Sequence, residues 1–277
     1  MTDTRAGLVR FVQAGTVRLA YRTWGSAGAP PLVLLHALGE QSTDWAPVAR
    51  AFESSWRGYA PDLRGHGASD WTGPYTIEQL TADLGAFLDA LGLQQVALGG
   101  HSMGGPPAYL YAARHPARVT RLVLEDPAPP WPRPARVLAR PEGPLPFDWE
   151  VTALSNEFTA NPQLTAWREE LRRIAAPALI IAGGPARSLI PNGPVVPASP
   201  GPPPDGCLRR SRWWVIFHPQ GWKMTHAHGQ PHRSRDNSKK RTASARLAVE
   251  GWYLSVIWVV MTTQITDKPK PGAYSAG

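Results

Sequence analysis

Two kinds of hydrophobic spacing alternate along residues 8–182. An apolar run at 8–12, a glycine at position 15 and alternating apolar and polar positions over 17–22 predict a β-hairpin over residues 8–24. Apolar runs at 31–35, 96–99, 120–125 and 178–182 predict strands buried on both faces, as in a parallel sheet. Residues 58–62 are typical of the end of a further short strand.

Between these runs the apolar positions follow a helical period. The clearest case is 77–91, where six apolar side chains fall on one stripe: Ile77, Leu80, Leu84, Phe87, Leu88 and Leu91. Thr76 with Gln79 three residues later predicts a capping box, and Gly92 predicts the end of the helix. Weaker helical patterns cover 43–53, 103–114, 149–158 and 162–173, whereas 127–147 is irregular and rich in proline.

This alternation of strands and helices predicts an α/β fold with a mostly parallel sheet and flanking helices. The stretch between the strands at 120–125 and 178–182 is too long for a simple crossover. We therefore expect a small cap over about residues 127–176, above the carboxyl edge of the sheet, where open α/β folds bind ligands.

The regular pattern ends near residue 187. Seven prolines between positions 191 and 204 argue against helix and central strand there, and residues 208–247 are basic and polar with scattered tryptophans. We expect a C-terminally incomplete domain over 1–187, followed over 188–277 by an atypical tail, rich in proline, arginine and tryptophan and irregular or disordered. A shifted reading frame or a gene fusion would produce such a change.

Charge divides the chain at the same point. Residues 1–187 contain 17 arginines and 17 acidic residues, whereas residues 188–277 contain 12 basic and 4 acidic residues, so the net charge of +8 belongs to the tail. No nucleic-acid motif accompanies this charge, and no nucleic-acid partner is expected. The single cysteine, Cys207, excludes an internal disulfide and favours the reducing cytoplasm. Neither a signal peptide nor an apolar run long enough to span a membrane is expected.

Candidate chemistry lies in the motif Gly100-His101-Ser102-Met103-Gly104. The pattern G-x-S-x-G is a weak signal alone, but here a predicted strand runs into it and a predicted helix leaves it, as a nucleophile elbow requires. Ser102 is therefore the candidate nucleophile. The N–H of Met103, at a helix N-terminus, is a candidate donor to an oxyanion.

A second motif follows the strand at 31–35 and reads His36-Ala37-Leu38-Gly39, in which the N–H of Leu38 is the candidate second oxyanion donor. Together with the runs at 61–69 and 121–126, four motifs stand in the right order and spacing. On these motifs residues 8–187 resemble the α/β-hydrolase superfamily, in particular its cofactor-free, esterase-like branch.

The resemblance implies a serine nucleophile assisted by a histidine, acting without a cofactor on a carboxylic ester or similar acyl bond of a small molecule. It also implies that the loop at 62–67 is structural. Two departures stand out: Ala37 replaces a frequent glycine, and Pro106-Pro107 follows the elbow.

The acid and the base are harder to assign. The superfamily usually places the acid after the strand that here ends at Ile181, but residues 182–187 contain no carboxylate. Some members place it one strand earlier, which makes Asp126 the candidate; the alternative is that Asp126 opens the proline-rich turn that follows. The base is unassigned among four histidines, none of which follows a recognisable strand: His218, His226, His228 and His232.

The other polar residues suggest less chemistry. His226 and His228 have a spacing that suits a metal, but few other ligands lie near them, so no metal site is expected. The remaining histidines are interpreted as structural, because three lie inside backbone motifs and the last ends a helix: His36, His66, His101 and His115.

Three functions stay open. The first is the serine hydrolase just described. The second is a hydrolase-fold protein that has lost its general base with its C-terminus, which in comparable enzymes costs about 10⁶-fold in kcat. The third is an interaction module whose basic, tryptophan-containing tail contacts nucleic acid or an acidic partner. Neither the substrate nor the oligomeric state is specified by the sequence.

Overall fold

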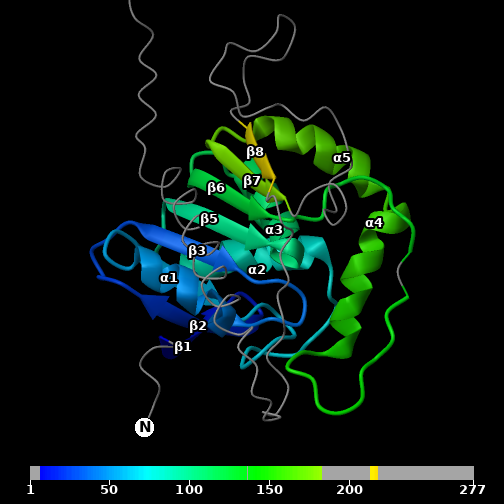
Figure 1. The fold of residues 1–277 in the computed structure, drawn as a ribbon, viewed down its shortest axis with the longest axis horizontal. Coiled ribbons are helices and arrows are strands. Elements are labelled where there is room, and N and C mark those ends of the chain that lie inside the picture. The colour runs from blue at the N-terminus through cyan, green and yellow to red at the C-terminus, as the bar shows by residue number, and fades with distance from the viewer. Residues whose placement is uncertain (1–6, 136, 183–212, 218–277) are drawn as a thin grey trace, which may run out of the picture. The chain divides into compact units, whose positions relative to one another are not determined.

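The computed structural model describes residues 7–135, 137–182 and 213–217 and arranges them around an eight-stranded sheet (Figure 1). The strand order is β1-β2-β4-β3-β5-β6-β7-β8. From β4 to β8 all neighbouring strands are parallel, and only the two pairs that involve β2 are antiparallel. The predicted α/β fold with a mostly parallel sheet is confirmed.

An antiparallel hairpin forms one edge of the sheet. It consists of β1 (Leu8–Ala14) and β2 (Val17–Trp24), with Ala14 opposite Val17. Gly15 supplies the positive φ, 61°, that the tight turn requires. Strand β2 is mostly buried, whereas the edge strand β1 is mostly exposed.

Five parallel strands follow, and their carboxyl ends meet at one edge of the sheet. They are β3 (Pro31–Leu35), β4 (Arg57–Pro61), β5 (Val96–His101), β6 (Val119–Glu125) and β7 (Ala178–Ala182). In register, Leu35 pairs with Gly100 and His101 pairs with Glu125. The apolar runs of the sequence thus become central strands, and they bring the loops that follow them to the same place.

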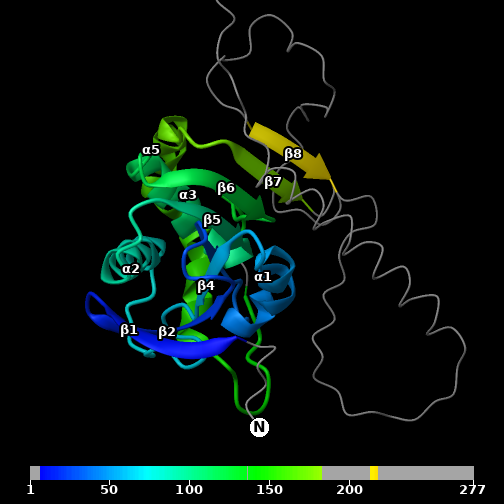
Figure 2. The same cartoon turned by 90° about the vertical axis from the view of Figure 1, so that its left-hand side faces the viewer.

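Helices cover both faces of the sheet. Helices α2 (Ile77–Ala90) and α3 (Gly105–Arg114) lie on one face, and the 3₁₀ helix η2 (Ser42–Trp45) leads into α1 (Ala46–Phe52) on the other (Figures 1 and 2). The Thr76 hydroxyl accepts the Gln79 N–H at 3.0 Å, as predicted. The Gln79 side chain donates instead to Asp83, so only half of the predicted capping box forms.

The segment between β6 and β7 begins irregularly and ends in short helices. These are η4 (Trp149–Asn156), α4 (Glu157–Ala160), α5 (Gln163–Glu170) and η5 (Leu171–Arg173). Its first part pairs with the loop after β4, where the Gly67 N–H donates to the carbonyl of Pro146. Its second part packs on the sheet-flanking helices, where Arg114 of α3 binds Glu170.

Strand β8 (Trp213–Phe217) pairs in parallel with β7, from Ala178 opposite Trp213 to Ala182 opposite Phe217. The sequence pattern does not indicate this strand. The rest of the predicted tail lies outside the described residues. Across the ranges that the structure describes, no helix combines the length and the hydropathy that a membrane crossing demands.

Candidate active site

Ser102 occupies a sharp turn between β5 and α3, within the 3₁₀ turn η3 (Ser102–Gly104). Its φ of 47° lies in the left-handed region, which residues other than glycine rarely adopt and which recurs at functional sites. The flanking glycines let the turn close. A Cβ on Gly100 would lie 2.5 Å from the carbonyl oxygen of Gly104, and a Cβ on Gly104 would lie 2.5 Å from that of Leu35.

The start of α3 accommodates the two prolines of the sequence. The helix begins at Gly105, so Pro106 and Pro107 both fall in its first turn, where backbone N–H groups have no intrahelical acceptor. Met103 is buried in η3, immediately before this helix. The strand–turn–helix arrangement predicted around Ser102 is therefore present.

The loop at residues 36–40, after β3, lies against this elbow through the contact between Leu35 and Gly104. Two of its amides are held by side chains: the Ala37 N–H donates to Glu40 Oε2 at 3.1 Å, and the Gly39 N–H donates to His66 Nε2 at 3.3 Å. Leu38 lies between them and is partly buried. Within the described ranges its N–H has no acceptor.

Asp126 directly follows β6 at the same edge of the sheet. Its φ is 37°, which makes it and Ser102 the two non-glycine residues with positive φ in the described part of the chain. Its N–H donates to the carbonyl of Ile181 at 2.8 Å and so joins the ends of β6 and β7. Asp126 follows β6, and β6 is the neighbour of β5, the strand that leads to the elbow.

His101, the residue before the nucleophile candidate, is surrounded by carboxylates. Its Nδ1 lies 3.2 Å from Glu40 Oε2, and both side chains are mostly buried. Burial by itself would lower the pKa of His101. The neighbouring carboxylates outweigh it and raise the pKa to about 9; they belong to Glu125, Glu40 and Asp126. His101 is therefore a charged group at neutral pH.

His36 and His66 are buried and neutral. The Nδ1 of His36 contacts the Ala37 carbonyl at 2.8 Å while its Nε2 accepts the Leu63 N–H at 2.9 Å, so the proton lies on Nδ1. Burial lowers the pKa of His36 to about 4 and that of His66 to about 3. Both rings brace the loops around the elbow, in agreement with the structural role predicted for them.

The loop at 62–67 is anchored to its neighbours through Asp62. Asp62 is buried, and its carboxylate accepts the N–H groups of Ser42 at 2.7 Å and Ala68 at 3.0 Å. Gly67 packs directly on this carboxylate. His115, the fourth histidine interpreted as structural, caps the C-terminus of α3.

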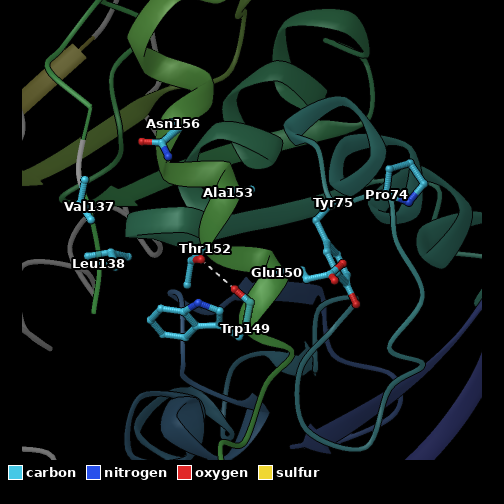
Figure 3. A pocket seen from close by; sticks show the side chains of 9 residues that line it. All are labelled: Pro74, Tyr75, Val137, Leu138, Trp149, Glu150, Thr152, Ala153 and Asn156. Atoms are coloured by element: carbon cyan, nitrogen blue, oxygen red, sulfur yellow. Dashed lines mark hydrogen bonds between the residues drawn. The ribbon is translucent and has the colours of Figure 1, made fainter. Parts of the chain in front are cut away.

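A groove of about 600 Å³ lies on the segment after β6 (Figure 3). Trp149, Val137 and Leu138 face it from one side, and Tyr75 and Pro74 from the other. The remaining lining is mostly polar: Glu150, Thr152, Ala153 and Asn156. None of the candidate catalytic residues lines this groove, so it is not the site around Ser102.

The structure brings together Ser102, Leu38, Met103 and Asp126 at one edge of the sheet. The four histidines considered for the base lie outside the described residues: His218, His226, His228 and His232. No cluster of three or more metal-binding side chains occurs within 7–135, 137–182 and 213–217. Sequence reasoning missed Glu40 and Glu125. The one available signal was their position: Glu40 follows the predicted strand at 31–35, and Glu125 ends the predicted strand at 120–125.

This architecture is that of the α/β-hydrolase fold, and the corresponding family model matches residues 30–178. The match covers more than half of the chain, and the protein belongs to this family. The family predicted from the four motifs is confirmed.

Among curated proteins, the chain is similar to epoxide hydrolase 4 of Mus musculus, with 36% identity over 119 residues that make up 42% of this chain and 33% of that protein. It is also similar to lipase LipV of Mycobacterium tuberculosis, with 37% identity over 112 residues, 40% of this chain and 42% of that protein. The chain thus spans less than half the length of these relatives.

Among solved structures, the crystal structure of a membrane phospholipase A has a TM-score of 0.55 and 24% sequence identity, and the alignment covers 77% of this chain and 79% of that one. At this identity the likeness shows a shared fold. The chain is therefore similar to hydrolases of different chemistry, and its own activity has to be argued from its residues.

Proposed function

We propose that the protein is a serine hydrolase that cleaves a carboxylic ester or similar acyl bond of a small molecule. The observation that carries this proposal is the backbone of Ser102, whose φ of 47° holds a serine, and not a carboxylate, on the strand-to-helix turn. A serine there favours acyl transfer over the chemistry of relatives that need a carboxylate nucleophile. The lipase similarity supports the same class.

In the proposed reaction the Ser102 hydroxyl attacks the acyl carbon while a histidine takes its proton. The carbonyl oxygen becomes an oxyanion, which the N–H groups of Leu38 and Met103 stabilise. Collapse of the tetrahedral intermediate releases the alcohol, which the same histidine protonates. Water then attacks the acyl-enzyme: the histidine takes a proton from the water and returns one to Ser102 as the acid leaves. Asp126 orients the histidine, and no metal or cofactor takes part.

The base belongs to the sequence after β8. The first residue after Phe217 is His218, and β8 runs parallel to the strands that lead to Ser102 and Asp126. In this family the catalytic histidine follows the last strand. We therefore rank His218 ahead of His226, His228 and His232.

Hydrolysis of p-nitrophenyl acetate and butyrate, measured beside Ser102→Ala, tests the proposal. Turnover that disappears in Ser102→Ala is expected, and His218→Ala is expected to lower kcat by at least about 10³-fold if it is the base. Lack of turnover from folded protein, together with failure of a fluorophosphonate probe to label Ser102, would reject the proposal.

A second candidate is a hydrolase-fold protein without a working base. It is favoured by the lack of a carboxylate in residues 182–187 and by the change of composition and charge after residue 187. In this candidate the hydrolase sequence proper covers 1–187, with a cap at about 127–176, and 188–277 is an unrelated tail. The same assay separates the two candidates. In either case we propose a cytoplasmic protein that does not bind nucleic acid.

A further inference from the structure

Three features lie outside the proposed reaction: the groove beside Trp149, the exposed edge strand β1, and the charged group around His101. The last is built from the most specific contacts. It links two loops that belong to the proposed active site, and no part of the proposed reaction uses it.

The loop that carries Leu38 is fixed on both sides of that residue. The preceding amide, of Ala37, is bound by Glu40, and the following amide, of Gly39, is bound by His66. Each acceptor is a side chain, so both neighbouring N–H groups are satisfied inside the protein. Among the described residues the Leu38 N–H has no acceptor, so the loop offers a donor in a braced backbone, which is what an oxyanion hole needs.

Glu40 connects this loop to the elbow. A single oxygen, Oε2, accepts the Ala37 N–H at 3.1 Å and lies 3.2 Å from Nδ1 of His101. His101 immediately precedes Ser102 in the chain. One carboxylate oxygen thus joins the two backbone segments whose N–H groups, from Leu38 and Met103, must act together on one substrate oxygen.

The surroundings of His101 favour a charged bridge. The groups that face it are His36 at the end of β3, Glu40 in the following loop, and Glu125 and Asp126 at the end of β6. Three of these are carboxylates, and their effect on the pKa of His101 exceeds the opposing effect of burial. A hydrogen bond to an ionised partner is stronger than a neutral one.

We propose that Glu40 is a positioning residue, which holds the oxyanion loop in register with the nucleophile elbow by binding the Ala37 amide and the His101 imidazole at once. The proposal rests on the proposed serine hydrolase function. Glu40 does not touch the substrate. Its loss lets the loop relax relative to Ser102, and the donors then no longer meet the oxyanion at the distance that catalysis requires.

The test compares Glu40→Ala, Glu40→Gln and the control Glu53→Ala, which removes an exposed carboxylate at the end of α1. In p-nitrophenyl butyrate hydrolysis, Glu40→Ala is expected to lower kcat by about 10- to 100-fold with KM within about twofold, because the oxyanion exists only in the transition state. Glutamine still offers an oxygen to the Ala37 N–H, so Glu40→Gln is expected to recover part of kcat. The control should match wild type.

A second readout does not depend on turnover. The pKa of His101 is followed by NMR in full-length protein, with its signal assigned through His101→Gln, and hydrogen exchange reports the Ala37 amide. Both Glu40 variants should lower the pKa of His101, and Glu40→Ala should speed exchange at Ala37 but not at residues of α2.

The outcomes separate the two proposals. A Glu40→Ala variant with wild-type kcat, or an unchanged His101 pKa and Ala37 exchange rate, overturns the role of Glu40 while leaving the hydrolase function intact. If wild type has no turnover and a fluorophosphonate probe does not label Ser102, the proposed function fails. The bridge is then upheld by the expected NMR changes and overturned by their absence.

Discussion

At the scale of single residues, the elbow depends on an approach of two backbones that only glycine permits. Gly104 has an ordinary φ of −73°, so space and not conformation decides what fits there. A Cβ would meet the carbonyl oxygens of Leu35 at 2.5 Å and His36 at 2.8 Å, and backbone cannot swing aside as a side chain can. The strand β3 and the elbow would have to separate.

We therefore expect Gly104→Ala to destabilise the protein by about 1–3 kcal/mol and to lower the proposed esterase activity at least tenfold, because the loop at residues 36–40 moves with β3. Urea unfolding and p-nitrophenyl butyrate hydrolysis measure both effects. The matched control is Gly28→Ala: a Cβ there has nothing within 4 Å, and its φ is not positive. A Gly104→Ala variant as stable as Gly28→Ala would contradict the close approach.

His36 and His66, the two buried histidines whose pKa values are lowered, make stability depend on pH in a defined direction. In the folded state the pKa values of His36 and His66 are lowered to about 4 and 3, from 6.5 in the unfolded chain. Below pH 6.5 the unfolded state takes up protons that the folded state does not. Stability is therefore lost as the pH falls, by up to about 1.4 kcal/mol per pH unit for each histidine.

The measurement is the free energy of unfolding in urea at pH 7, 6 and 5, beside NMR titration of the two rings. Both rings should stay neutral with the proton on Nδ1 down to pH 5. Protonation of either ring near pH 6.5 in folded protein would show that its site is more open to water than the contacts imply.

Sequence reasoning located some of these residues and not others, for physical reasons. Ser102 was predictable because glycines at fixed spacing announce a strained turn between a strand and a helix. Glu40 was not, because its partners Ala37 and His101 are joined only when β3 and β5 become neighbours in the sheet. Roles that arise from pairing between strands leave no local pattern.

At the scale of elements, one buried ion pair ties the loop after β4 to helix α2. Arg64 donates from Nε and Nη2 to the two carboxylate oxygens of Asp83, both at 2.7 Å. The two side chains are only 4% and 6% exposed, so loss of one partner leaves a buried charge without compensation.

We expect Asp83→Ala to cost about 3–5 kcal/mol in the free energy of unfolding, measured with urea. The control is Glu169→Ala, which breaks an exposed pair with Arg172 at the end of α5 and should cost less than about 1 kcal/mol. Equal losses in the two variants would mean that the Arg64–Asp83 pair does not depend on burial for its effect.

The elements themselves followed closely from hydrophobic spacing. Residues 77–91 gave a helix of the expected length because its apolar stripe, N-cap and terminal glycine agree. The second half of the capping box needs the Gln79 side-chain oxygen to accept the Thr76 N–H. The Gln79 side chain instead turns to Asp83, one turn later, and its Nε2 donates to Asp83 Oδ1 at 3.0 Å. A competing side chain on the same helix face decided that detail.

At the scale of the whole molecule, the sheet reaches beyond the point where its sequence pattern changes. Strand β8 contains the residues Trp-Trp-Val-Ile-Phe, a run of high β-propensity. The sequence did not predict this strand, because basic residues and prolines surround the run. A five-residue apolar run without regular hydrophobic spacing on either side cannot be assigned to a strand or a helix. The strand covers the edge of β7 that a domain ending near residue 187 would expose.

An exposed parallel edge next to buried strands is a template for aggregation, because its N–H and C=O groups lack partners. A chain of residues 1–187 is therefore expected to aggregate or to unfold at lower temperature than the full chain, by size-exclusion chromatography and thermal unfolding. A chain of residues 1–232 keeps β8 and should behave like the full protein.

If instead 1–187 is monomeric and equally stable, β8 adds nothing to the domain, and the incomplete hydrolase domain inferred from composition would be the folding unit. If both truncated chains fail, residues after 232 are needed as well, and the view of them as an unrelated tail would have to be given up.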